Sequence, residues 1–240
     1  MARIARVVVP GYPHHVTQRG NRGLETFFDD DDYALYRALL AERCEEVGVE
    51  VWAYCLMPNH VHLILVPSDA DGLRAALGET HRRYTRHING REGWQGHLWQ
   101  DRFYSVPMDE AHTLACARYV EVNPVRARMK RRARDWKWSS ARAHLAGRDD
   151  ELVRVAPLLE MVPDWPAYLA EAADDDEIEA IRMGTRTGRP FGATAFVRRL
   201  ERRFDRTFVR GKPGPKPKTK PAGRAKKKPA PKTKRRAGRR

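Results

Sequence analysis

Two histidines, His60 and His62, have the residue type and the spacing that could bind a metal ion. Side chains two positions apart on a β-strand point to the same face, so both imidazoles could reach one ion. The alternative is a chance polar pair beside a turn. Pro58 and Asn59 before the pair, and the apolar residues 63–66 after it, favour the metal site.

Tyr119 and Asn123 form a second pair, four residues apart, and on a helix they would lie on one face. Together with two imidazoles, the Asn123 oxygen would leave open positions, which suits Mg²⁺ or Mn²⁺ coordinating a phosphate. A zinc hydrolase would more often add a carboxylate or a third histidine. Two simpler explanations stay open, namely a core tyrosine and a helix that ends before Pro124. Periodicity alone does not favour Tyr119 over Tyr84 or Tyr104.

The motifs around these residues resemble those of the single-tyrosine HUH transposases, and most of all the branch of REP-associated tyrosine transposases. The resemblance covers about residues 5–145, and TGRPFG (187–192) resembles the extension of longer family members. The matching stretches are MPNHVHLIL (57–65), YVEVNPVRA (119–127), HVTQRGNR (15–22), GHLWQDRF (96–103) and WKWSS (136–140).

The resemblance implies a role for each of the four residues. His60 and His62 would be the metal ligands, with Val61 between them, and Tyr119 would be the nucleophile. Asn123 would occupy the position of the third ligand, where the related insertion-sequence enzymes have a glutamine. The family's substrates are single-stranded DNA with imperfect palindromic hairpins flanked by a short guide sequence. The cofactor would be a divalent metal ion, Mg²⁺ or Mn²⁺.

The activity implied is that of a DNA strand transferase and endonuclease, which nicks and rejoins single strands. A phenol has a pKa of about 10, so Tyr119 is a weak nucleophile unless a metal neutralises the scissile phosphate. Its attack would give a 5′-phosphotyrosine and a free 3′-OH, and a second 3′-OH could rejoin the strand without ATP. One alternative is a hairpin-binding regulator or chromosome-organising protein with little catalysis. Another is a metal-dependent phosphohydrolase that uses water.

Basic and aromatic residues near the motifs could bind an unpaired DNA strand through phosphate contacts and base stacking. Trp94, Trp99 and Phe103 are candidates for stacking, although core packing is the simpler explanation. We expect His14 and His15 to be incidental. The predicted DNA-binding residues are Arg19, Arg22, Arg82, Arg83, Arg86 and Arg102.

Hydrophobic periodicity and turn residues predict the elements that position these side chains. The order strand–helix–strand–strand–helix–strand–helix predicts an α+β fold, a ferredoxin-like antiparallel sheet with helices on one side. The strands are expected at 15–19, 49–56, 60–66 and 103–107, the helices at about 29–47, 72–88 and 109–122, and a loop at 90–96.

The chain is expected to have three parts. Residues 1–145 would form the transposase catalytic domain, and residues 146–209 a helical C-terminal extension in which prolines break the helices and 196–204 form one more helix. Residues 210–240 consist only of Lys, Arg, Pro, Gly, Ala and Thr. They cannot bury enough apolar area to fold, so we expect a disordered tail.

Charge is unevenly distributed along the 240 residues. Of the 46 Lys and Arg residues, 15 lie in 210–240, so residues 1–209 hold 31 basic residues against 31 acidic ones. The tail therefore carries the whole net charge of +15, which predicts nonspecific binding to nucleic acid.

Composition also predicts the compartment. Cys44, Cys55 and Cys116 are far apart and form no C-x-x-C pair, which favours a reducing environment. No segment approaches the roughly 20 apolar residues of a membrane-spanning helix, and no signal peptide is apparent. We expect a cytoplasmic, nucleoid-associated protein with no membrane partner, and the sequence leaves its oligomeric state open.

Overall fold

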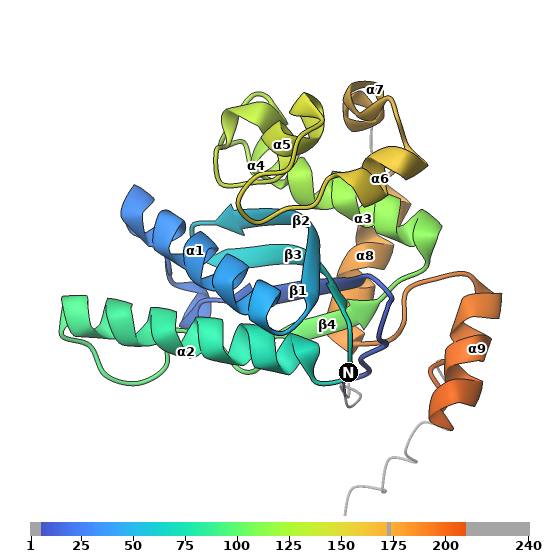
Figure 1. Cartoon of the computed structure of the whole chain (residues 1–240), viewed down its shortest axis with the longest axis horizontal. Coiled ribbons are helices and arrows are strands. Elements are labelled where there is room, and N and C mark those ends of the chain that lie inside the picture. The colour runs from blue at the N-terminus through green and yellow to red at the C-terminus, as the bar shows by residue number, and fades with distance from the viewer. Residues whose placement is uncertain (1–5, 172–173, 210–240) are drawn as a thin grey trace, which may run out of the picture. The chain divides into compact units, whose positions relative to one another are not determined.

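The computed structural model describes residues 6–171 and 174–209. Its core is a four-stranded antiparallel sheet in the order β2-β3-β1-β4, with βαββαβ connections (Figure 1). This order and these connections define a ferredoxin-like fold, so the predicted α+β class is confirmed. The elements are β1 (His14–Arg19), α1 (Asp30–Glu46), β2 (Val49–Met57), β3 (His60–Pro67), α2 (Gly72–Glu92), β4 (Tyr104–Pro107) and α3 (Glu110–Glu121).

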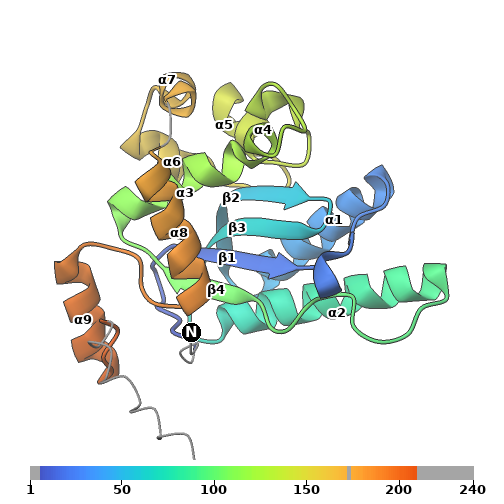
Figure 2. The same ribbon diagram turned by 180° about the vertical axis from the view of Figure 1, so that it is seen from behind.

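Helices cover both faces of the sheet. On one face, α1 and α2 pack in a core that includes Tyr36 and Leu63. On the other face, α3 and α8 (Asp175–Thr187) pack around Ile64 and Cys116 (Figure 2). We expected helices on one side of the sheet only. This is correct for α1 and α2, but it misses the second layer, which contains α3 and α8. That layer forms because β2 and β3 are largely buried on both faces, as a strand between two helical layers must be.

Two local signals set the ends of α1 and α2. Asp29 caps α1, because its side chain accepts a hydrogen bond from the backbone N of Asp32 at 2.9 Å. α2 continues to Glu92, whereas we expected a loop from Gly90 onward. The reason is that Gly93, with φ of 67°, adopts the left-handed conformation that ends a helix, while Gly90 stays helical.

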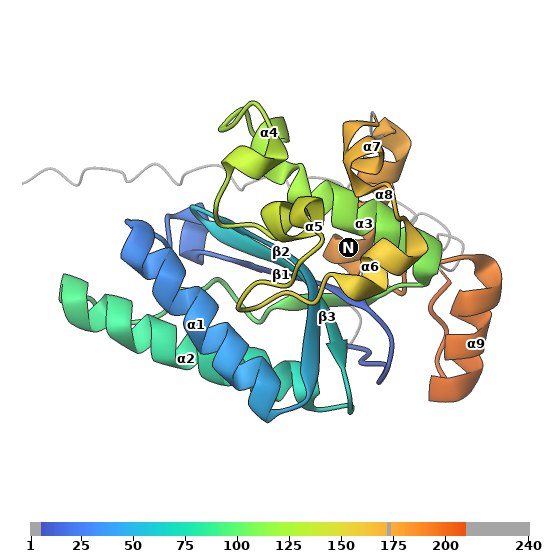
Figure 3. The same cartoon turned by 45° about the horizontal axis from the view of Figure 1, so that its top comes forward.

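A series of short helices follows α3 (Figure 3). Pro157 and Pro166 lie in the first turns of α6 and α7, where a backbone N–H has no helical partner, so they begin helices rather than break them. After α8, the backbone N of Phe191 donates to Pro107 O at 2.9 Å, which ties this segment to β4. The helices are α4 (Asn123–Arg126), α5 (Ala141–Ala146), α6 (Ala156–Met161), α7 (Trp165–Ala170), α8 and α9 (Thr194–Phe204).

Two expectations concern parts of the chain beyond these elements. The predicted tail, 210–240, lies outside the described residues. The predicted boundary between a catalytic domain and an extension, at 145–146, stays a prediction. In the described part of the chain, no helix has the length and apolar character needed to span a membrane.

Candidate active site

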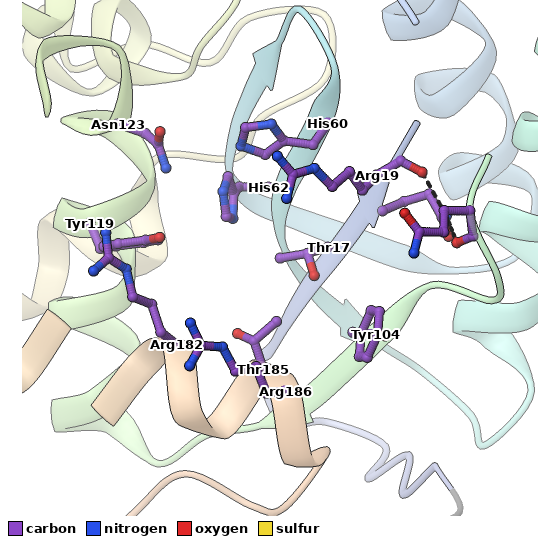
Figure 4. A pocket seen from close by; sticks show the side chains of 12 residues that line it. Thr17, Arg19, His60, His62, Tyr104, Tyr119, Asn123, Arg182, Thr185 and Arg186 are labelled. Carbon is purple, nitrogen blue, oxygen red and sulfur yellow. Dashed lines mark hydrogen bonds between the residues drawn. The ribbon is translucent and has the colours of Figure 1, made fainter. Parts of the chain in front are cut away.

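A pocket of about 550 Å³ lies between strands β1 and β3 and helices α3 and α8 (Figure 4). In Figure 4, Tyr119 and Asn123 on one wall face His60 and His62 on the other. The structure therefore brings the predicted nucleophile and the predicted metal ligands into one site. The lining residues are Thr17, Gln18, Arg19, His60, His62, Gln100, Tyr104, Tyr119, Asn123, Arg182, Thr185 and Arg186.

A hydrogen bond to Asn59 orients His60. Asn59 Nδ2 donates to Gly23 O at 3.0 Å, so Asn59 Oδ1 is the atom that accepts from His60 Nδ1 at 2.6 Å. Neutral His60 therefore carries its proton on Nδ1 and has a free lone pair on Nε2. Burial, and to a lesser degree the charge of Arg19, lowers the pKa of His60 to about 4, so the ring is neutral at pH 7.

His62 lies on the same face of β3 as His60 and is more deeply buried. Burial, together with the neighbouring His60, His15 and Arg126, holds the pKa of His62 well below its usual value. The ring is therefore neutral at pH 7. Its Nδ1 atom lies 3.0 Å from Nε2 of His15, which leaves Nε2 of His62 as the nitrogen available to the pocket.

This donor set fits a small divalent cation. Each histidine has its Nδ1 atom engaged by a neighbouring side chain, as metal-binding histidines generally do. Asn123 adds a neutral oxygen to the same pocket. Within residues 6–171 and 174–209, no group of three or more His, Cys, Asp or Glu side chains could hold a metal, so a closed structural zinc site is not found there. Two imidazoles and an amide oxygen leave positions for phosphate oxygens on Mg²⁺ or Mn²⁺.

Tyr119 lies beside His62. Its ring is edge-on to the imidazole, with the ring centroids 5.5 Å apart and an interplanar angle of 86°. The guanidinium of Arg126 lies 4.8 Å from the Tyr119 ring centroid. Tyr84, by contrast, is fully buried in the core, where its hydroxyl donates to Thr26 O at 2.7 Å. The structure thus separates two tyrosines that periodicity could not.

Asn123 begins a new helix instead of continuing α3. Val122, which joins α3 to α4, keeps a right-handed helical conformation with φ of −85° and ψ of −3°. Because the backbone stays helical through Val122, Asn123 lies about one turn after Tyr119, and both side chains line the same pocket. Tyr104 also lines this pocket, from β4, but the ring contact to His62 belongs to Tyr119.

A second cavity, of about 570 Å³, lies beside α2. Gln18 lines both this cavity and the first pocket, so the two are neighbours. Arginines in its lining suit the phosphates of a single strand. Trp99 and Phe103 also border it, but both are buried in the core, so core packing rather than base stacking explains these two rings. The predicted residues found here are Arg82, Arg86, Arg102, Trp99 and Phe103.

Of the three remaining predicted arginines, two lie outside both cavities. Arg83 forms an ion pair with Glu42 of α1 at 2.6 Å. Arg22 lies in a short 3₁₀ helix, Asn21–Gly23, and has a left-handed φ of 57°. Arg19, in contrast, lines the pocket with the histidines.

Sequence reasoning missed a group of residues on β1. His15, which we expected to be incidental, is hydrogen-bonded to His62, so that expectation is wrong. Strand periodicity was the available signal, because His15, Thr17 and Arg19 alternate onto one face. The register confirms it, since Thr17 pairs with His62 and Arg19 with His60.

Helix α8 supplies a second group that sequence reasoning missed, namely Arg182, Thr185 and Arg186. Thr185 and Arg186 lie three and four residues after Arg182, so all three are on the same side of the helix. Among the described residues that line the pocket none is acidic. Glu179 on α8 pairs with both Arg182 and Arg186, so it offsets one of the three arginine charges and the lining stays positive. Such a pocket attracts phosphate. No local pattern could have placed α8 here, because its position depends on packing across the whole sheet.

Comparison with known proteins agrees with the motifs. Residues 11–123 match the family model of IS200-like transposases. A Haemophilus influenzae protein named as a REP-associated tyrosine transposase is 25% identical over 116 residues, which span 44% of this chain and 66% of that protein, just under two thirds of its length. A solved structure of a REP-associated tyrosine transposase bound to a REP hairpin matches with a TM-score of 0.53 at 21% identity, over 63% of this chain and 90% of that one. At that identity the structural match shows a shared fold. The predicted resemblance is confirmed.

Proposed function

We propose that this chain, whose residues 11–123 match the family model of IS200-like transposases, nicks and rejoins single-stranded DNA at hairpin elements. The match supports a role as a DNA-processing enzyme. The reaction would pass through a covalent bond between Tyr119 and a DNA 5′-phosphate. One observation carries the proposal: Tyr119 lies edge-on to His62, 5.5 Å between ring centroids, in a pocket whose charged side chains are arginines.

In the covalent step, one bond to phosphorus replaces another. The Oη atom of Tyr119 attacks phosphorus, an Oη–P bond forms, and the bond between phosphorus and the 3′ oxygen breaks. The phenol proton passes to water, and the departing 3′ oxygen takes up a proton to become a hydroxyl. Arg182 and Arg186 would bind the nonbridging oxygens, where their charge stabilises the transition state. Rejoining is the reverse, with another 3′-OH as the attacking group.

His60, His62 and Asn123 would hold a divalent metal ion, Mg²⁺ or Mn²⁺. When bound, such an ion neutralises charge on the scissile phosphate and polarises the phosphorus. Both imidazoles are neutral at pH 7 because burial lowers the pKa of each, so neither must lose a proton before it binds.

The proposed substrate is a single strand that carries a hairpin. The solved structure with the same fold was bound to a REP hairpin. In this chain, the second cavity beside the pocket supports a path for an unpaired strand, because arginines that could bind its phosphates line the cavity. Phosphate contacts are proposed for Arg19, Arg82, Arg86 and Arg102, which line the two cavities. Arg22 and Arg83 line neither cavity, and Arg83 pairs with Glu42, so the proposal does not extend to these two.

The domain roles follow from the same proposal. Residues 1–145 would form the catalytic domain and residues 146–209 an extension that contributes α8 to the pocket. Residues 210–240, with 15 cations, would add nonspecific affinity for DNA and so keep the protein in the nucleoid.

Two other functions predict different products. A hairpin-binding regulator would bind the same DNA and leave it intact. A metal-dependent phosphohydrolase would cut the strand with water and form no bond to the protein. The position of Tyr119 beside His62 favours the covalent route over both.

A search for a covalent adduct tests the proposal. The full chain is incubated with a pool of labelled single-stranded hairpins, with Mn²⁺ or with EDTA, and analysed on denaturing gels. We expect a DNA–protein adduct with Mn²⁺ only, and peptide mass spectrometry should locate it at Tyr119. Cleavage without an adduct would favour the phosphohydrolase, and binding without cleavage would favour the regulator.

A further inference from the structure

A chain of hydrogen bonds runs from α8 through β1 to His62. The hydroxyl of Thr185 lies 3.2 Å from His15 Nδ1, and His15 Nε2 lies 3.0 Å from His62 Nδ1. The two imidazole planes differ by only 8°. His15 is 3% exposed, so its ring nitrogens have these side chains as partners rather than bulk water.

The hydrogen bond made by Thr185 decides which atom donates and which accepts in the bonds that connect it to His62. The Thr185 hydroxyl has one proton and donates it to Ile181 O at 3.0 Å, the usual bond of a helical threonine to the carbonyl one turn back. Thr185 can then only accept from His15 Nδ1–H. Neutral His15 has no second proton, so its Nε2 accepts from His62 Nδ1–H. The single proton of His62 is thereby fixed on Nδ1, and the lone pair on Nε2 faces the pocket.

If each of these hydrogen bonds ran in the opposite direction, His62 could not bind a metal through Nε2. If Thr185 donated to His15 Nδ1, His15 would carry its proton on Nε2 and donate to His62 Nδ1. His62 would then carry its own proton on Nε2, the nitrogen that a metal needs. The bond from Thr185 to Ile181 O is what excludes this arrangement.

We infer that Thr185 and His15 are positioning residues that select the metal-binding tautomer of His62, which makes α8 a working part of the catalytic site. This inference rests on the proposed function, because it assigns Nε2 of His62 to the metal. It goes beyond the family match, which ends at residue 123, whereas Thr185 lies on α8. Figure 4 shows Thr185 on the α8 wall of the pocket, on the side of Thr17.

The chain offers a matched control on the same helix. Thr187 Oγ1 also donates to the carbonyl one turn back, Met183 O at 3.0 Å, and its side chain is buried. Its other hydrogen bonds, to Gly184 O and from the backbone N of Arg189, do not involve a histidine. Thr185→Val and Thr187→Val therefore remove the same kind of hydroxyl from α8. Only Thr185 belongs to the series of hydrogen bonds from Thr185 through His15 to His62, which we call the relay.

The test observes the tautomer directly in metal-free protein. Long-range ¹H–¹⁵N NMR of the imidazoles at pH 7.5 should show His62 protonated on Nδ1 in the wild type, in Thr187→Val and in Thr185→Ser. In Thr185→Val the form protonated on Nε2 should appear. Titration with Mn²⁺, followed by electron paramagnetic resonance, should show affinity weaker by about 10-fold or more in Thr185→Val only.

The outcomes separate the relay from the proposed function. A wild-type His62 protonated on Nε2 overturns the relay, whatever the variants do. So does a Thr185→Val protein whose His62 tautomer and Mn²⁺ affinity equal those of Thr187→Val. If wild-type protein gives the adduct at Tyr119 in either case, the proposed function stands and only the relay is wrong. If it gives no adduct, the proposed function fails independently of the NMR result.

Discussion

The ring of Tyr119 stands edge-on to the imidazole of His62, at 86° and with 5.5 Å between centroids. The tyrosine comes from α3 and the histidine from β3 of the same chain. The nucleophile and the metal ligands of the proposed site are thus assembled without a residue from a second copy. Single substitutions in one polypeptide can therefore test the roles of both.

Removing the Tyr119 hydroxyl should stop cleavage and leave hairpin binding nearly unchanged, because Tyr119→Phe loses only the attacking oxygen. Strand cleavage on denaturing gels and binding by fluorescence anisotropy measure the two effects separately. Tyr104→Phe is the matched control, since Tyr104 lines the same pocket. If Tyr104→Phe stopped cleavage and Tyr119→Phe did not, the nucleophile would be Tyr104 of β4 and the assignment to Tyr119 would be wrong.

Removing a metal ligand should have graded effects. His60→Ala and His62→Ala should each abolish metal-dependent cleavage, and EDTA should inactivate wild-type protein until Mg²⁺ or Mn²⁺ is added back. Asn123→Ala should be milder, because water can replace a neutral oxygen ligand. Cleavage rates at several Mn²⁺ concentrations would show the order. Full activity of the wild type in EDTA would exclude the metal-dependent mechanism.

Sequence predicted the parts of the site that depend on local patterns. The spacing of two residues on a strand was enough to place His60 and His62 on one face. The order of helices and strands was enough to predict the ferredoxin-like sheet. Tyr119 needed the family resemblance, because a helical tyrosine is usually a core residue. The contact of Thr185 with His15 joins residues separated by 170 positions, and it depends on how α8 packs on the sheet. No periodicity carries such information.

Glu121 joins α3, the helix of the proposed nucleophile, to the helices that follow. It is fully buried and accepts hydrogen bonds from Ser140 Oγ at 2.5 Å and Trp165 Nε1 at 3.0 Å, and its Oε1 lies 2.6 Å from His144 Nδ1. Glu121→Ala would leave Trp165 Nε1 and His144 Nδ1 unpaired in the core, so we expect the free energy of unfolding to fall by about 3 kcal/mol or more. Urea titrations measure it.

Glu110→Ala is the control for this prediction. Glu110 lies exposed in the first turn of the same helix, where a carboxylate contributes only about 0.3–1 kcal/mol through the helix dipole. Equal losses in the two variants would show that the Glu121 cluster adds no stability beyond helix electrostatics.

Stability should fall with acid because of His14. Its Nε2 accepts from Val9 N at 3.0 Å and its Nδ1 donates to Tyr12 O at 2.7 Å. Burial lowers the pKa of His14 to about 4, from the usual histidine value of 6.5. Between these values the unfolded chain binds the extra proton and the folded one does not, so stability is lost as pH falls from 6.5 toward 4. At pH 5 this loss is about 2 kcal/mol.

Urea titrations of wild type and His14→Gln at pH 7 and pH 5 isolate this contribution. The variant should be less stable at pH 7, because its packing and hydrogen bonds change, but its loss between the two pH values should be smaller by about 2 kcal/mol. The same pH-dependent loss in both proteins would assign the acid sensitivity to other groups.

Arg86 and Arg83 lie on the same helix and differ in where they point, so they test the path of the DNA strand. Arg86 lines the second cavity, whereas Arg83 pairs with Glu42 of α1 outside both cavities. Arg86→Ala should weaken binding of single-stranded DNA and lower the slope of log K against log salt by about 0.7, the value for one phosphate contact on a single strand. Arg83→Ala should leave both nearly unchanged, since it breaks only an exposed ion pair, which contributes little to stability. Binding titrations at several salt concentrations, with full-length variants so that the basic tail is constant, measure the difference. If the two variants lost the same slope, the strand would contact the outer side of α2, and the second cavity would not be its path.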